Sequence, residues 1–182
     1  MQVPTPTATP HALSASVVGD IVGTDGNAYT TSAAYYGGAY HLPDGVTAAG
    51  VVVVKSETEG ESYVVSLHNS ATNVTWDNRA NGLTEISQVT GKSWSVITEQ
   101  QRQIIVPFQN PFAIGYISAA GGQISADANY WTDTEDTSTS AHYFQFNGYV
   151  SNRQKTKSAS VLPIFTFYDY PHSYHQTTNN KG

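Results

Sequence analysis

The chain has 182 residues, of which 39% are hydrophobic and only 12% charged, and its formal net charge is −6. This length suits one domain with terminal arms, and such a chain buries roughly 70% of its unfolded surface. The lack of cysteine excludes disulfides, zinc–thiolate sites and thiol nucleophiles. With only 8 Lys and Arg, the acidic balance argues against a nucleic-acid partner.

Both ends of the chain are predicted to lie outside the core. Prolines alternate with Thr and Ala in residues 2–10, and proline fixes φ and favours extended backbone. Residues 171–182 are polar and show no hydrophobic period. These patterns predict an extended N-terminal arm over residues 1–12, a β-domain over 13–170 and a C-terminal tail over 171–182. The ends are either frayed termini or arms that lie on neighbouring subunits.

Between the ends, the hydrophobic period is two, as in β-strands. The valine-rich run over residues 46–54 is typical of a strand buried on both faces, and residues 63–67 alternate like a half-buried strand. Further short strands are predicted over residues 83–89, 93–97, 112–116, 143–150 and 164–170. One helical turn is predicted over residues 98–103. Several short strands separated by Gly, Pro and Asn turns indicate an all-β sandwich or barrel.

The titratable residues show no spacing that predicts a reaction. The 6 histidines lack a close pair with a following acid, and no serine stands in a nucleophile elbow. Asp133, Glu135 and Asp136 lie in the segment TDTEDTSTS, which favours a solvated loop over a Ca²⁺ site because the D-x-D-x-D-G pattern is missing. The basic cluster over residues 153–157 indicates a charged loop or edge strand. The sequence therefore predicts a non-enzymatic protein without metal or cofactor.

The aromatic residues are the remaining signal. The chain has 12 Tyr and 3 Trp, residue types that are enriched at interfaces because they bury a large area and keep one polar tip. The same residue types line sugar-binding platforms, and many of them cap the core of a sandwich. Roles in an assembly interface are predicted for Pro4, Pro6, Tyr35, Tyr36, Tyr40, Tyr130, Trp131, Tyr168, Tyr170 and Tyr174.

The arm VPTPTATP, the run VTAAGVVVV, the alternating HYFQFNGYV and the aromatic PIFTFYDY together resemble a known family. They look like small single jelly-roll capsid proteins, of the upright single-barrel kind found in tailless icosahedral viruses with an internal membrane, from haloarchaea and Thermus. The resemblance covers residues 13–170. It implies a barrel of about eight antiparallel strands with extended arms. Such a subunit assembles with itself and with a second, larger capsid protein in the virion shell, beside the viral membrane.

Two other classes stay open. A carbohydrate-binding β-sandwich, such as a lectin or a viral receptor-binding spike domain, would use Trp131, Tyr130 or Trp76 as a stacking platform. A jelly-roll enzyme is disfavoured by the missing ligand pattern.

Lateral contacts of a capsid subunit would each bury about 1,200–2,000 Å². A glycan array with the isolated domain, together with the variant Trp131→Ala, would separate the lectin from the capsid subunit.

Overall fold

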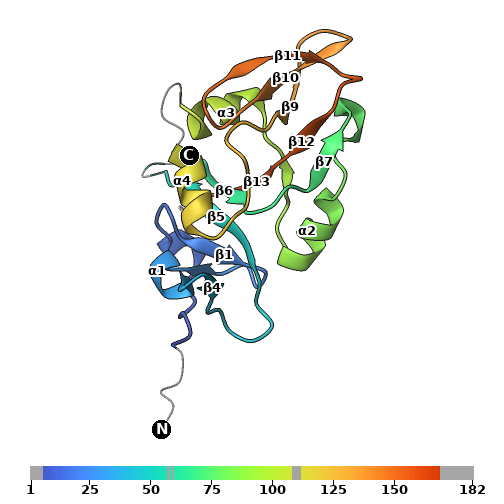
Figure 1. The fold of residues 1–182 in the computed structure, drawn as a ribbon. Helices are drawn as coiled ribbons and strands as arrows, with labels where there is room; N and C mark the ends of the chain where they lie inside the picture. Colours follow the sequence, from blue (N-terminus) through green and yellow to red (C-terminus); the bar gives the residue numbers. More distant parts are fainter. Residues whose placement is uncertain (1–5, 57, 59, 108–111, 169–182) are drawn as a thin grey trace, which may run out of the picture.

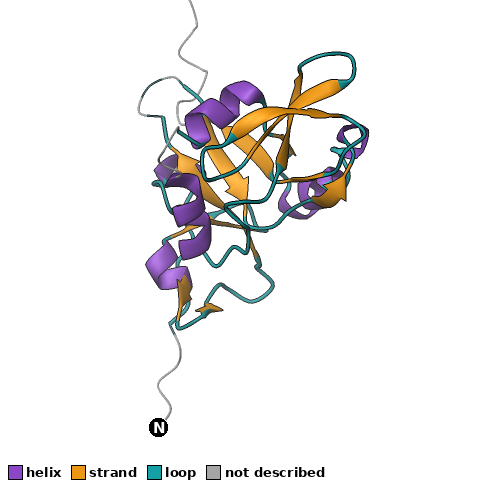
Figure 2. Ribbon diagram, turned by 45° about the horizontal axis from the view of Figure 1, so that its top comes forward, coloured by secondary structure: helices purple, strands orange, loops and turns teal. Residues whose placement is uncertain are grey.

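The described residues form two main β-sheets, one small two-stranded sheet and several short helices (Figure 1). The structure is a computed structural model, and it describes residues 6–56, 58, 60–107 and 112–168. Figure 2 shows that the helices lie outside the strands, which form the frame of the molecule. The prediction of a mostly β fold is therefore confirmed.

The larger sheet is antiparallel throughout and has the order β2-β1-β5-β6-β13-β8. Its strands are β1 (Ile21–Gly23), β2 (Ala28–Tyr29), β5 (Ala48–Val54), β6 (Ser62–Ser66), β8 (Ser95–Val96) and β13 (Pro163–Phe167). Val51 and Val52, adjacent in β5, are both fully buried. Because adjacent residues of a strand point to opposite faces, β5 is covered on both sides, as its valine run predicts.

The second sheet has the order β11-β10-β9-β12-β7 and lies at the top of Figure 1. Its strands are β7 (Ala71–Val74), β9 (Tyr130–Glu135), β10 (Ser140–Phe144), β11 (Val150–Gln154) and β12 (Ala159–Val161). β12 pairs with β9 in parallel, whereas its pairing with β7 and the pairings of β10 are antiparallel. Only the buried Leu162 separates β12 from β13, so one residue carries the chain from the second sheet to the larger one.

The remaining elements are short. β3 (Tyr35–Tyr36) and β4 (Ala39–Tyr40) form a small hairpin. The helices are η1 (Leu13–Ala15), α1 (Thr31–Ala34), η2 (Trp76–Asn78), α2 (Leu83–Thr90), α3 (Glu99–Ile105) and α4 (Phe112–Ala119). The helical turn predicted over residues 98–103 is confirmed by α3. Thr98 and Gln101 form a capping box, in which each side-chain oxygen accepts from the other residue's backbone N–H.

Two segments predicted as strands are helices instead. Residues 83–89 form most of α2, which follows Gly82 (φ +80°) and ends at Gly91 (φ +67°). Both glycines take left-handed backbone, which stops a strand and bounds a helix. Residues 112–116 lie in α4. Buried side chains in and just after α4 are Ala113, Ile117 and Ala120. Their spacing of four and three residues is helical, so the alternation in this segment does not mark a buried face.

The segment predicted as one strand over residues 143–150 is a hairpin. Strands β10 and β11 flank a turn in which Gly148 has φ +96°. Across this turn the Gln145 backbone N–H donates to the Tyr149 carbonyl at 2.8 Å. The alternation of side chains continues through the turn in the sequence, so the period of two did not reveal where the chain reverses.

The main core lies between the two sheets. It combines Val51, Val65 and Ile164 of the larger sheet with Tyr130 and Phe144 of the second. Two smaller clusters lie on the far sides of the sheets. The cluster beyond the second sheet contains Ala71, Trp76, Val96, Trp131, Ala141, Ala159 and Val161. The cluster beyond the larger sheet contains Val22, Ala49, Val52, Val64, Trp94 and Phe165. Both sheets are therefore covered on two faces over much of their area.

The predicted N-terminal arm is described from Pro6 onward. Ala8 is buried in the main core, and its backbone N–H donates to the His41 carbonyl at 2.9 Å. His11 forms a β-bridge with Ala28. The expectation that the arm lies outside the core is therefore corrected for Ala8 and His11, which contact their own domain, whereas Thr9 and Pro10 are exposed. The predicted C-terminal tail over residues 171–182 lies outside the described residues.

A jelly roll is a more specific prediction than an all-β fold, because it also fixes the number and the pairing of the strands. The described part of the chain holds thirteen short strands and one parallel pairing, whereas the sequence predicts about eight antiparallel strands. The strand count and the all-antiparallel pairing are thus corrected, and the order of strands alone does not establish a jelly roll.

Candidate functional site

One face of the second sheet gathers aromatic and charged side chains. The register places Trp131 opposite Tyr143, and Tyr143 opposite Ser151, so these three side chains share a face. Ala141 pairs with Arg153 on the same face. This surface, called here the Trp131 face, consists of Trp131, Ala141, Tyr143, Ser151 and Arg153. It is opposite to the face that carries Tyr130 and Phe144 into the main core.

Two tryptophans fix the loop after β7 onto the Trp131 face. The Trp76 indole N–H donates to the Thr132 carbonyl at 2.9 Å, and the Trp131 indole N–H donates to the Val74 carbonyl at 2.8 Å. Trp76 is only 9% exposed and Trp131 only 1%. Since each indole N–H is satisfied and each ring is buried, this pair forms a small core that supports the face from within.

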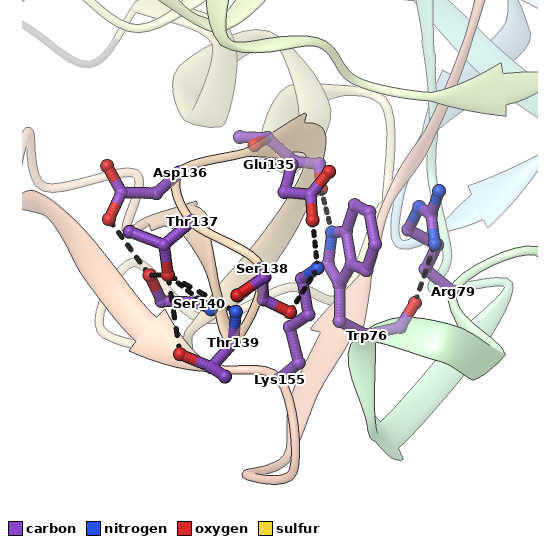
Figure 3. A network of polar contacts seen from close by, with 10 residues as sticks. Trp76, Arg79, Glu135, Asp136, Thr137, Ser138, Thr139, Ser140 and Lys155 are labelled. Carbon is purple, nitrogen blue, oxygen red and sulfur yellow. Dashed lines mark hydrogen bonds and ion pairs between the residues drawn. The ribbon is translucent and has the colours of Figure 1, made fainter.

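Two cations cover the Trp76 ring. The Arg79 guanidinium lies 3.4 Å and the Lys155 ammonium 4.6 Å from the ring centroid, and Figure 3 draws the indole between them. Arg79 also pairs with Asp133 at 2.5 Å, and Lys155 pairs with Glu135. The sugar-stacking platform considered for Trp76 is therefore wrong, because its ring is occupied by side chains of the same chain.

The turn between β9 and β10 is held by its own polar groups. The Thr137 hydroxyl accepts from the backbone N–H groups of Thr139 and Ser140, and the Ser140 hydroxyl donates to Asp136 at 2.9 Å (Figure 3). Lys155 donates to the Ser138 carbonyl at 3.1 Å. The acids considered for Ca²⁺ are thus engaged by a guanidinium group (Asp133), an ammonium group (Glu135) and a hydroxyl group (Asp136). No group of three potential metal ligands occurs within the described ranges.

A second aromatic and cationic group lies beyond this network. The rings of Tyr143 and Tyr149 are 6.1 Å apart, and the Arg153 guanidinium lies 5.8 Å from the Tyr143 ring. Tyr149 is 53% exposed. The Arg153 Nε is buried without a hydrogen-bond partner. We call Tyr143, Tyr149 and Arg153 the tyrosine–arginine surface. It offers an exposed ring and a cation to a ligand.

The charges on the two sides of the Trp131 face are not equivalent. Arg79 and Lys155 are neutralised by carboxylates, whereas no described carboxylate pairs with Arg153. Burial raises the pKa of Tyr143, and its hydrogen bond with Tyr149 raises it further, while the Arg153 charge opposes both. Tyr143 therefore keeps its hydroxyl proton at neutral pH. The surface therefore combines the Arg153 guanidinium, which only donates, with tyrosine hydroxyls, which can both donate and accept.

Tyr130 and Trp131, both predicted as interface residues, are corrected by their burial. Each is 1% exposed, and Tyr130 packs against Phe144 and Phe146 in the main core. They cannot touch a partner or a sugar without unfolding of the sheet. Their position next to a polar segment in the sequence suggested a loop, but the segment after them is the exposed end of β9, whereas their own part of the strand is interior.

Three of the predicted interface tyrosines lie on the β3–β4 hairpin. The rings of Tyr35 and Tyr40 lie 4.8 Å apart, and Tyr36 stacks on His41 at 3.7 Å. Tyr36 also donates to the carbonyl of Pro6 at 3.4 Å. Tyr36 and Tyr40 are exposed, so this hairpin is a second surface available to a partner.

Of the other predicted interface residues, Tyr168 is described and exposed, with its hydroxyl 3.2 Å from Glu61. Pro4, Tyr170 and Tyr174 lie outside the described residues. Sequence reasoning missed Tyr149 and Arg153 as partners. The available signals were the basic cluster over residues 153–157 and the glycine at 148, which marks the turn that brings the two residues onto one hairpin.

Among the described residues, no helix combines the length and the apolar character that a membrane crossing requires. No model of a known protein family matches the chain, and no curated protein sequence is significantly similar to it.

Proposed function

We propose that the chain is a non-enzymatic binding module that recognises a carbohydrate through the tyrosine–arginine surface. The observation that carries the proposal is the position of Arg153 over Tyr143 and beside the exposed Tyr149, without a described carboxylate partner. An exposed ring next to convergent donors is the chemistry by which proteins hold sugars, because a pyranose has an apolar face and a ring of oxygen acceptors.

The ligand follows from the groups present. The Tyr149 ring provides a face on which a sugar ring stacks. The Arg153 guanidinium donates in a planar fork, which suits two adjacent hydroxyl oxygens or one carboxylate. The net charge of −6 disfavours anions at long range, but salt screens such effects beyond about 8 Å. We therefore expect a neutral sugar or a uronic acid whose oxygens accept from Arg153.

A glycan array probed with the full chain tests this proposal. We expect binding to at least one glycan, with a loss of about tenfold or more in Tyr149→Ala and in Arg153→Gln. Tyr36→Ala and Lys157→Gln are the matched controls, because they remove an exposed tyrosine and a neighbouring cation outside the surface. An array without signal, or variants that bind like the parent chain, would overturn the proposal.

The capsid subunit is the second candidate, with a jelly-roll barrel as its fold. The exposed tyrosines favour it: Tyr36, Tyr40 and Tyr168 keep their hydroxyls near polar partners while their rings face outward. Such residues suit contacts with further copies of the chain, with a larger capsid protein or with a viral membrane in a virion.

Assembly is measured by light scattering and electron microscopy of the full chain at increasing concentration. The capsid proposal predicts closed particles, lost in Tyr36→Ser with Tyr40→Ser. A monomer at every concentration, both alone and mixed with other proteins of the source particle, would count against it. Deletion of residues 1–12 is a poorer probe of assembly, because it also removes Ala8 from the core.

A further inference from the structure

A cavity of about 390 Å³ lies between α2, the start of β5 and the chain after β6. This volume is within the range of small-molecule sites. Its apolar wall is formed by alanines of β5 and by one side of α2. Its polar rim comes from the segment after β6 and from the first turn of α2. Its lining includes Ala49, Ile86, Val89, His68, Asn69 and Glu85.

The cavity is kept open by the way α2 is anchored. The Trp94 indole N–H donates to the Thr90 hydroxyl at 2.8 Å, and the Thr90 hydroxyl donates to the Ile86 carbonyl at 2.7 Å. At the other end of the helix, Gly82 takes φ +80°, and a Cβ there would collide with the Ser70 carbonyl. Since both ends of α2 are fixed by close contacts, the helix cannot move inward to fill the space.

The charge of the cavity is one-sided. Its ionisable lining residues are Glu85 and His68, and neither lysine nor arginine lines it. No described cation pairs with Glu85. The Asn69 side-chain oxygen has no hydrogen-bond partner. The N-terminus of α2 adds about half a positive charge, which the full charge of the Glu85 carboxylate exceeds. The cavity is therefore an acceptor site with an apolar wall.

We propose that this cavity binds a small primary amine with an apolar body. The ammonium group donates to the Glu85 carboxylate and to the Asn69 side-chain oxygen. The apolar body lies against Ala49, Ile86 and Val89. This site is independent of the tyrosine–arginine surface, because none of the residues of that surface lines the cavity. The failure of one proposal therefore leaves the other in place.

The test uses phenethylamine as the probe, with 2-phenylethanol and 3-phenylpropionate as neutral and anionic analogues of similar shape. Each is titrated into the full, ¹⁵N-labelled chain and followed by amide chemical shifts. We expect phenethylamine to shift the amides of Ala49, Ile86 and Thr90 with a Kd on the order of 1 mM. The neutral analogue binds more weakly, and the anionic one weakest of the three.

Two exposed charge variants complete the test. Glu85→Gln is expected to weaken phenethylamine binding by up to about fivefold and to leave the binding of 2-phenylethanol unchanged. Asp44→Asn, an exposed acid outside the cavity, is the control and changes neither. The absence of shifts around the cavity, equal binding of amine and carboxylate, or unchanged amine binding in Glu85→Gln would each refute the proposal. Both substituted side chains are exposed, so we expect both variants to fold like the parent chain.

Discussion

Replacing Trp76 distinguishes a supporting core residue from a ligand platform. The ring is 9% exposed, its N–H is bonded to the Thr132 carbonyl at 2.9 Å, and two cations lie on it. Trp76→Phe keeps an aromatic ring but removes the indole N–H. The carbonyl of Thr132, a fully buried residue, then loses this donor. We expect a loss of about 1–3 kcal/mol in the free energy of unfolding. Trp76→Ala adds a cavity and costs about 3–5 kcal/mol.

The assay is urea unfolding of the full chain, with the midpoint converted through a common slope. Because a domain of this size has about 5–15 kcal/mol of stability, the alanine variant approaches complete loss of the fold, and Trp76→Phe gives the quantitative result. The control is Val17→Ala, at an exposed valine, with an expected change within about 0.5 kcal/mol. If Trp76→Phe were as neutral as this control and abolished glycan binding, the supporting role of Trp76 would be refuted.

Three further predictions concern the stability of the fold. Lys55→Met loses donation to the carbonyls of Ser14 and Ser16, at 3.0 and 2.6 Å, and should lower the melting midpoint by several degrees in calorimetry. Gly82→Ala should cost more than about 1 kcal/mol by chemical unfolding, because a left-handed backbone meets a blocking carbonyl. Burial and Glu61 raise the Tyr63 pKa, so stability is full below about pH 10 and falls above it. Tyr63→Phe should flatten this loss in melting curves above about pH 10, and an unchanged slope would contradict it.

The strands that the sequence predicts best are those whose burial is uniform. Residues 46–54 carry valines on both faces of β5, and no local competitor exists for such a run. The short helix α3 was also predictable, because its capping residues Thr98 and Gln101 act within one turn of the chain. In both cases the information is local, so the sequence alone determines the element.

The errors have two different causes. In residues 83–89 the apolar Leu83, Ile86 and Val89 recur every third residue, so the helical period of α2 was present in the sequence and was misread as a strand. Tyr130 and Trp131 are followed by polar residues, which suggested exposure, yet β9 lies inside a sheet whose two faces are both covered. A period of two cannot report that a strand is central, because centrality depends on which strands pair with it.

The candidate site was predictable only in its composition. Tyrosine abundance and the basic cluster over residues 153–157 were visible in the sequence. The turn at Gly148 that brings Tyr149 near Tyr143 was not, since the alternation continues across it. The neutralisation of Arg79 and Lys155 by Asp133 and Glu135 depends on the register of β9 with its neighbours. Arg153, on the neighbouring part of the same sheet, has no described acidic partner.

Amide chemical shifts of the full, ¹⁵N-labelled chain, recorded during titration with the strongest glycan from the array, show whether the tyrosine–arginine surface is the binding site. We expect the shifted resonances to cluster at residues 143 and 149–153, while those of the β3–β4 hairpin stay in place. Shifts that centre on that hairpin, or a spectrum that no glycan changes, would contradict this expectation.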